Sequence, residues 1–181
     1  MNWIIEQKIG KTRTEMNIEQ ITNLRAQAEE LLGMLLDTNV YFQKLAIEFY
    51  GFQEDESDIL TVRALAGAIE RLKEGERKID TSASGVLDRN MSLLFLLGSE
   101  KIIEENSVLI IGGVEAEVAG TVAEIEETLA VIKEHDKFIL GILKKTLNEP
   151  LYKKCAHAIK LGKKVRITAK ELFEANLAIV M

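Results

Sequence analysis

Hydrophobic residues recur with alternating three- and four-residue spacing between residues 17 and 50. Within this row of positions, only Thr38 is polar. Such a spacing over about four heptads is typical of a long helix that packs at a shallow angle on a partner helix. Asn17 suits the N-cap of this helix, and Gly51 suits its C-terminal end. The row consists of Ile21, Leu24, Ala28, Leu31, Leu35, Phe42, Leu45 and Phe49.

A second row of the same kind lies between residues 122 and 147. Thr121 and Glu124 form a capping box that predicts where this helix begins. Asp136 interrupts the row, and we interpret it, like Thr38, as a polar residue that fixes the register of packed helices, with a ligand or partner contact as the alternative. Two long rows in one chain predict helices that pack together or each against a copy of itself. The row consists of Val122, Ile125, Leu129, Ile132, Ile139 and Leu143.

Shorter elements are expected between the two rows. The acidic stretch 54–58 precedes a helix that runs to about Glu74, with one apolar face, and Gly75 ends it. Residues 76–85 are charged or small and predict a loop. A third helix is expected to begin after Ser84 or Gly85. Its stretch 93–97 is apolar on every side, which predicts a central place in the core, and a short helix is expected at 100–105.

Residues 107–119 permit two interpretations. The apolar run 108–111, the pair Gly112-Gly113 and the alternating stretch 114–118 together favour a β-hairpin with a two-glycine turn. The alternative is a helix, because Ile111, Val114, Val118 and Val122 also follow helical spacing.

The C-terminal part of the chain predicts three short elements. Pro150 lies in the first turn of a helix that follows Asn148 and ends near Leu161. Residues 164–167 suit a strand. Thr168 and Glu171 form a second capping box, which opens a terminal helix.

These patterns predict an all-α or nearly all-α fold, a long-helix bundle with coiled-coil-like seams and a small β-hairpin. The chain has 181 residues, 47% hydrophobic, and a single proline, which suits one core and long helices. We expect an N-terminal arm at 1–16, a helical bundle domain at 17–148 and a basic C-terminal helical segment at 149–181.

The expected location is cytoplasmic. Cys155 is the only cysteine, so no internal disulfide can form. The first residues lack the charged lead, apolar run and cleavage site of a signal peptide. The densest apolar run, 93–97, is far shorter than the ~20 residues that cross a bilayer, so no membrane span is expected.

The net charge of −6 conceals a strong asymmetry. Residues 144–170 carry nine basic residues and one acid, a formal charge of +8, whereas the rest of the chain carries −14. Such a cationic surface can neutralise phosphates of a nucleic acid or bind an anionic membrane surface, or it can pair with the acidic remainder within one subunit or between copies. The candidate residues for anion or nucleic-acid binding are Lys153, Lys154, His157, Lys160, Lys163, Lys164 and Arg166.

The search for catalytic chemistry assigns no catalytic residue, no cofactor and no metal ligand. His135 and His157 are the only histidines, and neither has a glutamate three positions before it, as di-iron bundles require. Cys155 and His157 are two residues apart, which points them in different directions on a helix. Cys155 is therefore interpreted as a buried structural thiol rather than a nucleophile.

The leading hypothesis is a non-enzymatic helical protein for protein–protein interaction or assembly, an adaptor or structural protein that forms a homo-oligomer. The alternative is a regulator that binds nucleic acid or another anion through residues 144–170. A third hypothesis, less favoured, is an enzyme whose site is dispersed along the sequence.

Overall fold

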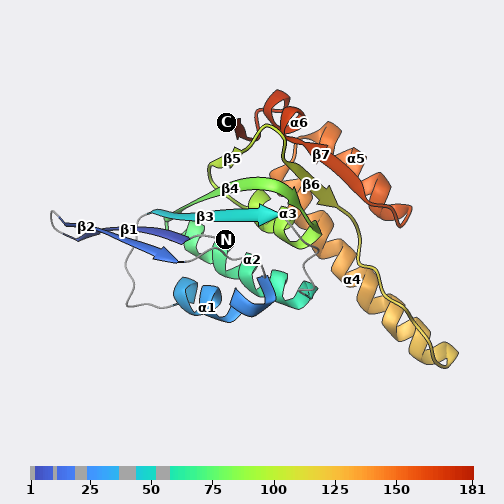
Figure 1. Ribbon diagram of the computed structural model, residues 1–181. Helices are drawn as coiled ribbons and strands as arrows, with labels where there is room; N and C mark the ends of the chain where they lie inside the picture. The colour runs from blue at the N-terminus through green and yellow to red at the C-terminus, as the bar shows by residue number, and fades with distance from the viewer. Residues whose placement is uncertain (1–2, 10–11, 19–23, 37–43, 52–57) are drawn as a thin grey trace.

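The computed structural model describes residues 3–9, 12–18, 24–36, 44–51 and 58–181, and these form a mixed α/β fold with a curled sheet (Figure 1). The prediction of an all-α helical bundle is therefore wrong. The strands are β1 (Trp3–Ile9), β2 (Thr12–Ile18), β3 (Lys44–Gly51), β4 (Lys78–Leu87), β5 (Lys101–Ile103), β6 (Val108–Ile111), β7 (Val165–Thr168) and β8 (Ile179–Val180). The helices are α1 (Leu24–Leu36), α2 (Ile59–Glu74), α3 (Arg89–Leu96), α4 (Val122–Thr146), α5 (Glu149–Lys160) and α6 (Ala169–Glu174).

The sheet follows the order β2-β1-β3-β4-β5-β8. β1 runs antiparallel to β2 and β3, whereas β3, β4, β5 and β8 run parallel to one another. The last two residues of β4, Val86 and Leu87, leave this path and pair with β6, which in turn pairs antiparallel with β7. β4 thus joins the main sheet to the C-terminal half of the chain.

The first hydrophobic row is divided between a helix and a strand. Ala28, Leu31 and Leu35 are buried on α1, but the chain is already in β3 at Lys44. Leu45 and Phe49 are four residues apart, a spacing that puts two side chains on one face of a helix and also on one face of a strand. Ile47 is buried between them, which is the two-residue period of a strand. Ile21, Thr38 and Phe42 lie outside the described residues.

The stretch predicted as a loop at 76–85 contains most of β4, a central strand. Its side chains are small because α3 packs directly on it. The Thr81 hydroxyl donates to the Phe95 carbonyl at 2.8 Å. A Cβ on Gly98 would lie 2.1 Å from Thr81 Oγ1, so only glycine fits there. Small and polar residues, which suggest a loop in isolation, are here the consequence of close helix–strand packing.

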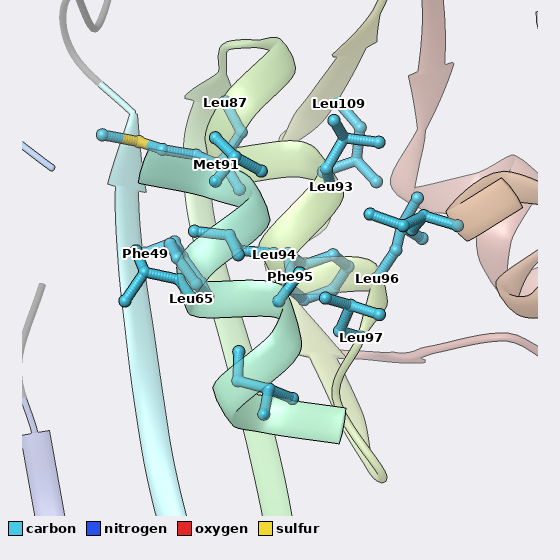
Figure 2. Close-up of a cluster of buried hydrophobic side chains, with 14 of the residues drawn as sticks. Phe49, Leu65, Leu87, Met91, Leu93, Leu94, Phe95, Leu96, Leu97 and Leu109 are labelled. Atoms are coloured by element: carbon cyan, nitrogen blue, oxygen red, sulfur yellow. The ribbon is translucent and has the colours of Figure 1, made fainter. Parts of the chain in front are cut away.

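α3 lies at the centre of the core, as its uniformly apolar stretch predicted. Met91 and all residues from Leu93 to Leu97 are buried. Figure 2 shows them clustered with Phe49 of β3, Leu65 of α2 and Leu109 of β6. Full burial of one such side chain contributes roughly 1.5–3 kcal/mol, so this cluster is a principal source of stability.

Two further short elements differ from expectation. Residues 101–103 form strand β5 instead of a helix, paired with β4 and β8. Residues 108–111 do form a strand, but it pairs with β4 and β7, and the stretch 114–118 is not a strand. The hairpin prediction is therefore wrong. The expected arm at 1–16 contains β1 and most of β2.

The helix ends predicted for α4, α5 and α6 are confirmed, whereas the predicted N-cap Asn17 lies in β2 and the predicted helix end Gly51 is the last residue of β3. Both capping boxes, Thr121 with Glu124 and Thr168 with Glu171, form as expected. Asn148 caps α5, and Pro150 lies in its first turn. Because these signals involve residues only three positions apart, they do not depend on the tertiary fold.

The two long helices expected to pair do not pair. α1 packs on α2, whereas α4 packs on α3 and α5. Among the described helices, none combines the length and apolarity required to cross a membrane.

Candidate interaction surfaces

The most distinctive feature outside the core is a long extension of the chain. After β6 the backbone runs outward beside α4, turns near Gly120, and returns through the first half of α4 (Figure 1). The tip lies well away from the sheet and from α5. We call residues 113–134 the projection.

Two hydrogen bonds clamp the root of the projection to the body. Arg89, the first residue of α3, donates from Nη1 to the Gly113 carbonyl at 2.8 Å. The Val114 amide donates to Asp136 Oδ1 at 2.9 Å. A Cβ on Gly113 would lie 2.9 Å from the same carboxylate oxygen, which explains why glycine is required there. Asp136, a residue of α4, therefore fixes the outgoing stretch of the projection beside this helix.

α2 holds the other side of α4. Arg63 Nη1 lies 3.3 Å from Glu134 Oε1, and the Arg63 guanidinium lies 5.3 Å from the Phe138 ring centroid. Lys145 Nζ lies 2.8 Å from Glu70 Oε1, a hydrogen bond that raises the pKa of Lys145. Exposed ion pairs contribute little to stability, typically 0–1 kcal/mol. Here these contacts between α2 and α4 set the direction in which the projection leaves the body.

The tip of the projection is ordered by its capping box. Glu124 Oε2 accepts the Thr121 amide at 2.7 Å, and this backbone hydrogen bond is the main cause of the lowered pKa of Glu124. Gly120, just before the cap, adopts φ +153°, and a Cβ there would lie 2.7 Å from the same Glu124 oxygen. The turn into α4 thus depends on glycine followed by threonine.

The second hydrophobic row changes its surroundings along α4. Ile139 and Leu143 are buried in the body, whereas Ile125 and Ile132 are only half-buried. In the projection, apolar side chains remain in water: Val122 is 74% exposed, Leu129 42% and Val131 48%. The projection also carries six acids and one lysine, a formal charge of −5. It is an acidic element with uncovered apolar positions.

The seven cationic residues predicted from the sequence lie together on α5, the following turn and β7, opposite the buried face formed by Leu151, Cys155 and Ile159. All seven are exposed. We call the exposed surface of residues 153–166 the basic surface. Sequence reasoning missed one member, Leu161, which is 53% exposed among these cations.

Three of the seven cations have partners within the chain. Lys153 Nζ lies 2.6 Å from Glu149, and Lys164 Nζ lies 3.3 Å from Glu115. Lys154 Nζ lies 2.5 Å from Glu171 and also donates to the Arg166 carbonyl at 3.1 Å. Within the part of the chain that the structure describes, four side chains have no ion pair: His157, Lys160, Lys163 and Arg166.

Cys155 is enclosed in the core beneath the basic surface. Burial raises its pKa to about 11, so the thiol is protonated at neutral pH. His157 is exposed on the opposite side of α5. The structure therefore does not bring the two residues together as a nucleophile and base.

A groove of about 300 Å³ lies on the face of β3, β4 and β5 away from the core. Several of its polar side chains pair with one another. Lys44 Nζ lies 2.6 Å from Asp80. The Tyr50 hydroxyl donates to Glu48 at 2.9 Å, which is the main cause of the raised pKa of Tyr50, and Ser84 donates to Glu104 at 2.7 Å. In the described ranges, no three His, Cys, Asp or Glu residues are grouped as metal ligands.

A scan against protein-family models and a search of curated proteins both return no match for this sequence. Function is therefore inferred from the residues and geometry described above.

Proposed function

We propose that this chain is a non-enzymatic assembly protein that associates with copies of itself through the projection. The observation that carries the proposal is the exposure of Val122, Leu129 and Val131 on a helix whose direction is fixed at its root. The first half of α4 adds no buried residue to the core of the monomer, but its exposed apolar side chains can contact a second molecule.

The exposed apolar side chains of the projection favour association. Burying the exposed part of each of these three side chains would contribute roughly 1 kcal/mol. The cost of ordering the contact is small, because two hydrogen bonds and the ion pairs to α2 already position α4. A preorganised element loses less conformational entropy when it binds.

A second copy is the partner that the charges support. The projection carries −5 and residues 144–170 carry +8, so every molecule presents both members of a complementary pair. The proposal includes a cytoplasmic location, for which the support is the lone, buried and protonated thiol of Cys155.

Sedimentation velocity over a wide concentration range tests the proposal. The wild-type protein is expected to sediment as an oligomer. The double variant Leu129→Glu with Val131→Glu is expected to sediment as a monomer with an unchanged circular dichroism spectrum, because both side chains are exposed and each substitution replaces an apolar side chain with a carboxylate that a contact would have to desolvate.

Leu60→Glu is the matched control, since Leu60 lies on α2 and is 61% exposed. It introduces the same chemical change away from the projection and should leave the oligomer intact. An oligomer that survives the projection variant, or a wild-type protein that is monomeric throughout, would contradict the proposal.

A further inference from the structure

We infer that the projection of one copy docks on the basic surface of the next copy, so that the contact joins two different surfaces. This inference rests on the proposed self-association and names the surface that the projection meets. It also explains the charge asymmetry of the sequence.

The acids of the projection are only partly used within the chain. Glu115 pairs with Lys164, Glu134 with Arg63, and Glu124 caps its own helix. The other three have no ion pair with any described residue: Glu117, Glu126 and Glu127. Glu117 precedes the turn at Gly120, and Glu126 and Glu127 lie in the first two turns of α4. Three uncompensated carboxylates there favour a cationic partner.

The basic surface offers the matching groups. His157, Lys160, Lys163 and Arg166 lack ion pairs in the described part of the chain, and Leu161 lies exposed between two of the lysines. The projection combines free acids with exposed Val122, Leu129 and Val131. The two surfaces therefore match in charge and in their apolar positions, which is the composition of a contact with an apolar centre and a polar rim.

The same chain cannot satisfy this match. The projection points away from α5, and among the described residues only the root pair Glu115–Lys164 links the two surfaces. Pairing two projections side by side would instead bring six acids from each copy together, which costs free energy. A single contact between unlike surfaces leaves one basic surface and one projection open in the pair, so the assembly closes as a reciprocal dimer or a larger ring, or extends as a filament.

Charge reversal tests this arrangement with two variants. The first, Glu126→Lys with Glu127→Lys, places two lysines on the projection and changes its formal charge from −5 to −1. The second, Lys160→Glu with Lys163→Glu, places two glutamates on the basic surface and changes its formal charge from +6 to +2. All four side chains are exposed and form no ion pair or side-chain hydrogen bond with a described residue, so both variants should retain the wild-type thermal midpoint. Glu29→Lys with Glu30→Lys on α1 is the matched control, because both residues are exposed and far from the two surfaces in the chain.

Each variant alone is expected to associate ~10-fold more weakly than the wild type, because a change of four charges on one surface weakens its attraction to the other. An equimolar mixture of the two variants should recover wild-type association. In the mixture, the two introduced lysines of the first variant meet the two introduced glutamates of the second, and their unmodified surfaces also match. The control should behave as the wild type.

Three results would overturn the inference. If the second variant associates normally while the first does not, projections pair with projections. If neither variant changes an assembly that Leu129→Glu with Val131→Glu abolishes, self-association stands but the named surface is wrong. If the basic surface binds a duplex oligonucleotide with steep salt dependence and its reversal leaves the oligomer unchanged, that surface serves a nucleic acid instead.

Discussion

Asp136 Oδ1 accepts a hydrogen bond of 2.9 Å from the backbone amide of Val114, twenty-two residues earlier in the chain. This contact ties the outgoing stretch of the projection to α4 near its root. Together with the Arg89–Gly113 hydrogen bond, it holds the outgoing backbone of the projection beside α4. Asp136, the polar residue that interrupts the second hydrophobic row, thus stabilises a contact within its own chain.

Replacement of Asp136 should loosen the root of the projection. Asp136→Ala leaves the half-buried Val114 amide without an acceptor, at a cost of about 1–3 kcal/mol. Hydrogen exchange at the Val114 amide should accelerate, while exchange in α3 stays slow. Asp136→Asn keeps an acceptor oxygen and should retain most of the protection. Equal protection in the Ala variant and the wild type would show that this hydrogen bond does not hold the root.

Loss of the capping box should fray the tip of α4. Thr121→Ala removes the side chain that accepts the Glu124 amide, and such a change costs about 0.5–2 kcal/mol. Faster exchange is expected for the amides at 123–125, with the second half of α4 unaffected. Thr128→Ala is a suitable control, since Thr128 donates only to the Glu124 carbonyl within the same helix. If both variants fray the tip equally, the box has no special role.

Truncation of Phe95 should have the largest effect on global stability. Its side chain is fully buried on α3 among β3, α2 and β6 residues (Figure 2), and Phe→Ala changes in cores cost about 3–5 kcal/mol. Urea denaturation should show this loss. Leu60→Ala, at an exposed position of α2, should change the free energy of unfolding by less than about 0.5 kcal/mol. A small effect at Phe95 would place the core elsewhere.

Cys155 should make stability depend on alkaline pH. Its pKa is about 11 in the folded protein and 9.0 in the unfolded chain, so between these values the folded state holds the proton more tightly. The contribution of the thiol is therefore complete below pH 9 and decreases as pH rises towards 11. Denaturation of wild type and Cys155→Ala across this range should show a steeper decline in the wild type. Parallel curves would mean that the thiol ionises freely in the folded state.

The same burial should protect Cys155 from thiol reagents. Ellman's reagent is expected to modify it slowly in native buffer and rapidly in denaturant, because the thiolate is the reactive form and the folded protein suppresses it. Rapid modification of the native protein would contradict the enclosed position beneath the basic surface.

Local signals in the sequence predicted part of this structure. Capping boxes at Thr121 and Thr168, the Asn148 cap and the uniformly apolar α3 all depend on residues a few positions apart, and each is present. The fold class required non-local information. Leu45 and Phe49 satisfy a helical and a strand period equally, and β4 is built from small residues whose reason is contact with α3.

The candidate surfaces were predicted unevenly. The cations of the basic surface were visible as a charge cluster, and they lie together on α5, its turn and β7. Their pairing was not visible, because Lys164–Glu115 and Lys154–Glu171 join residues distant in sequence. The projection was also not visible, since a hydrophobic row gives no indication of which half is covered. The expected domain boundaries after residues 16 and 148 stay predictions.

Native mass spectrometry of the purified wild-type protein tests self-association through the projection. We expect a species whose mass is a multiple of 20.3 kDa, and its conversion to the single-chain mass by Leu129→Glu with Val131→Glu. A wild-type protein observed only at 20.3 kDa, at every concentration sampled, would contradict assembly through the projection.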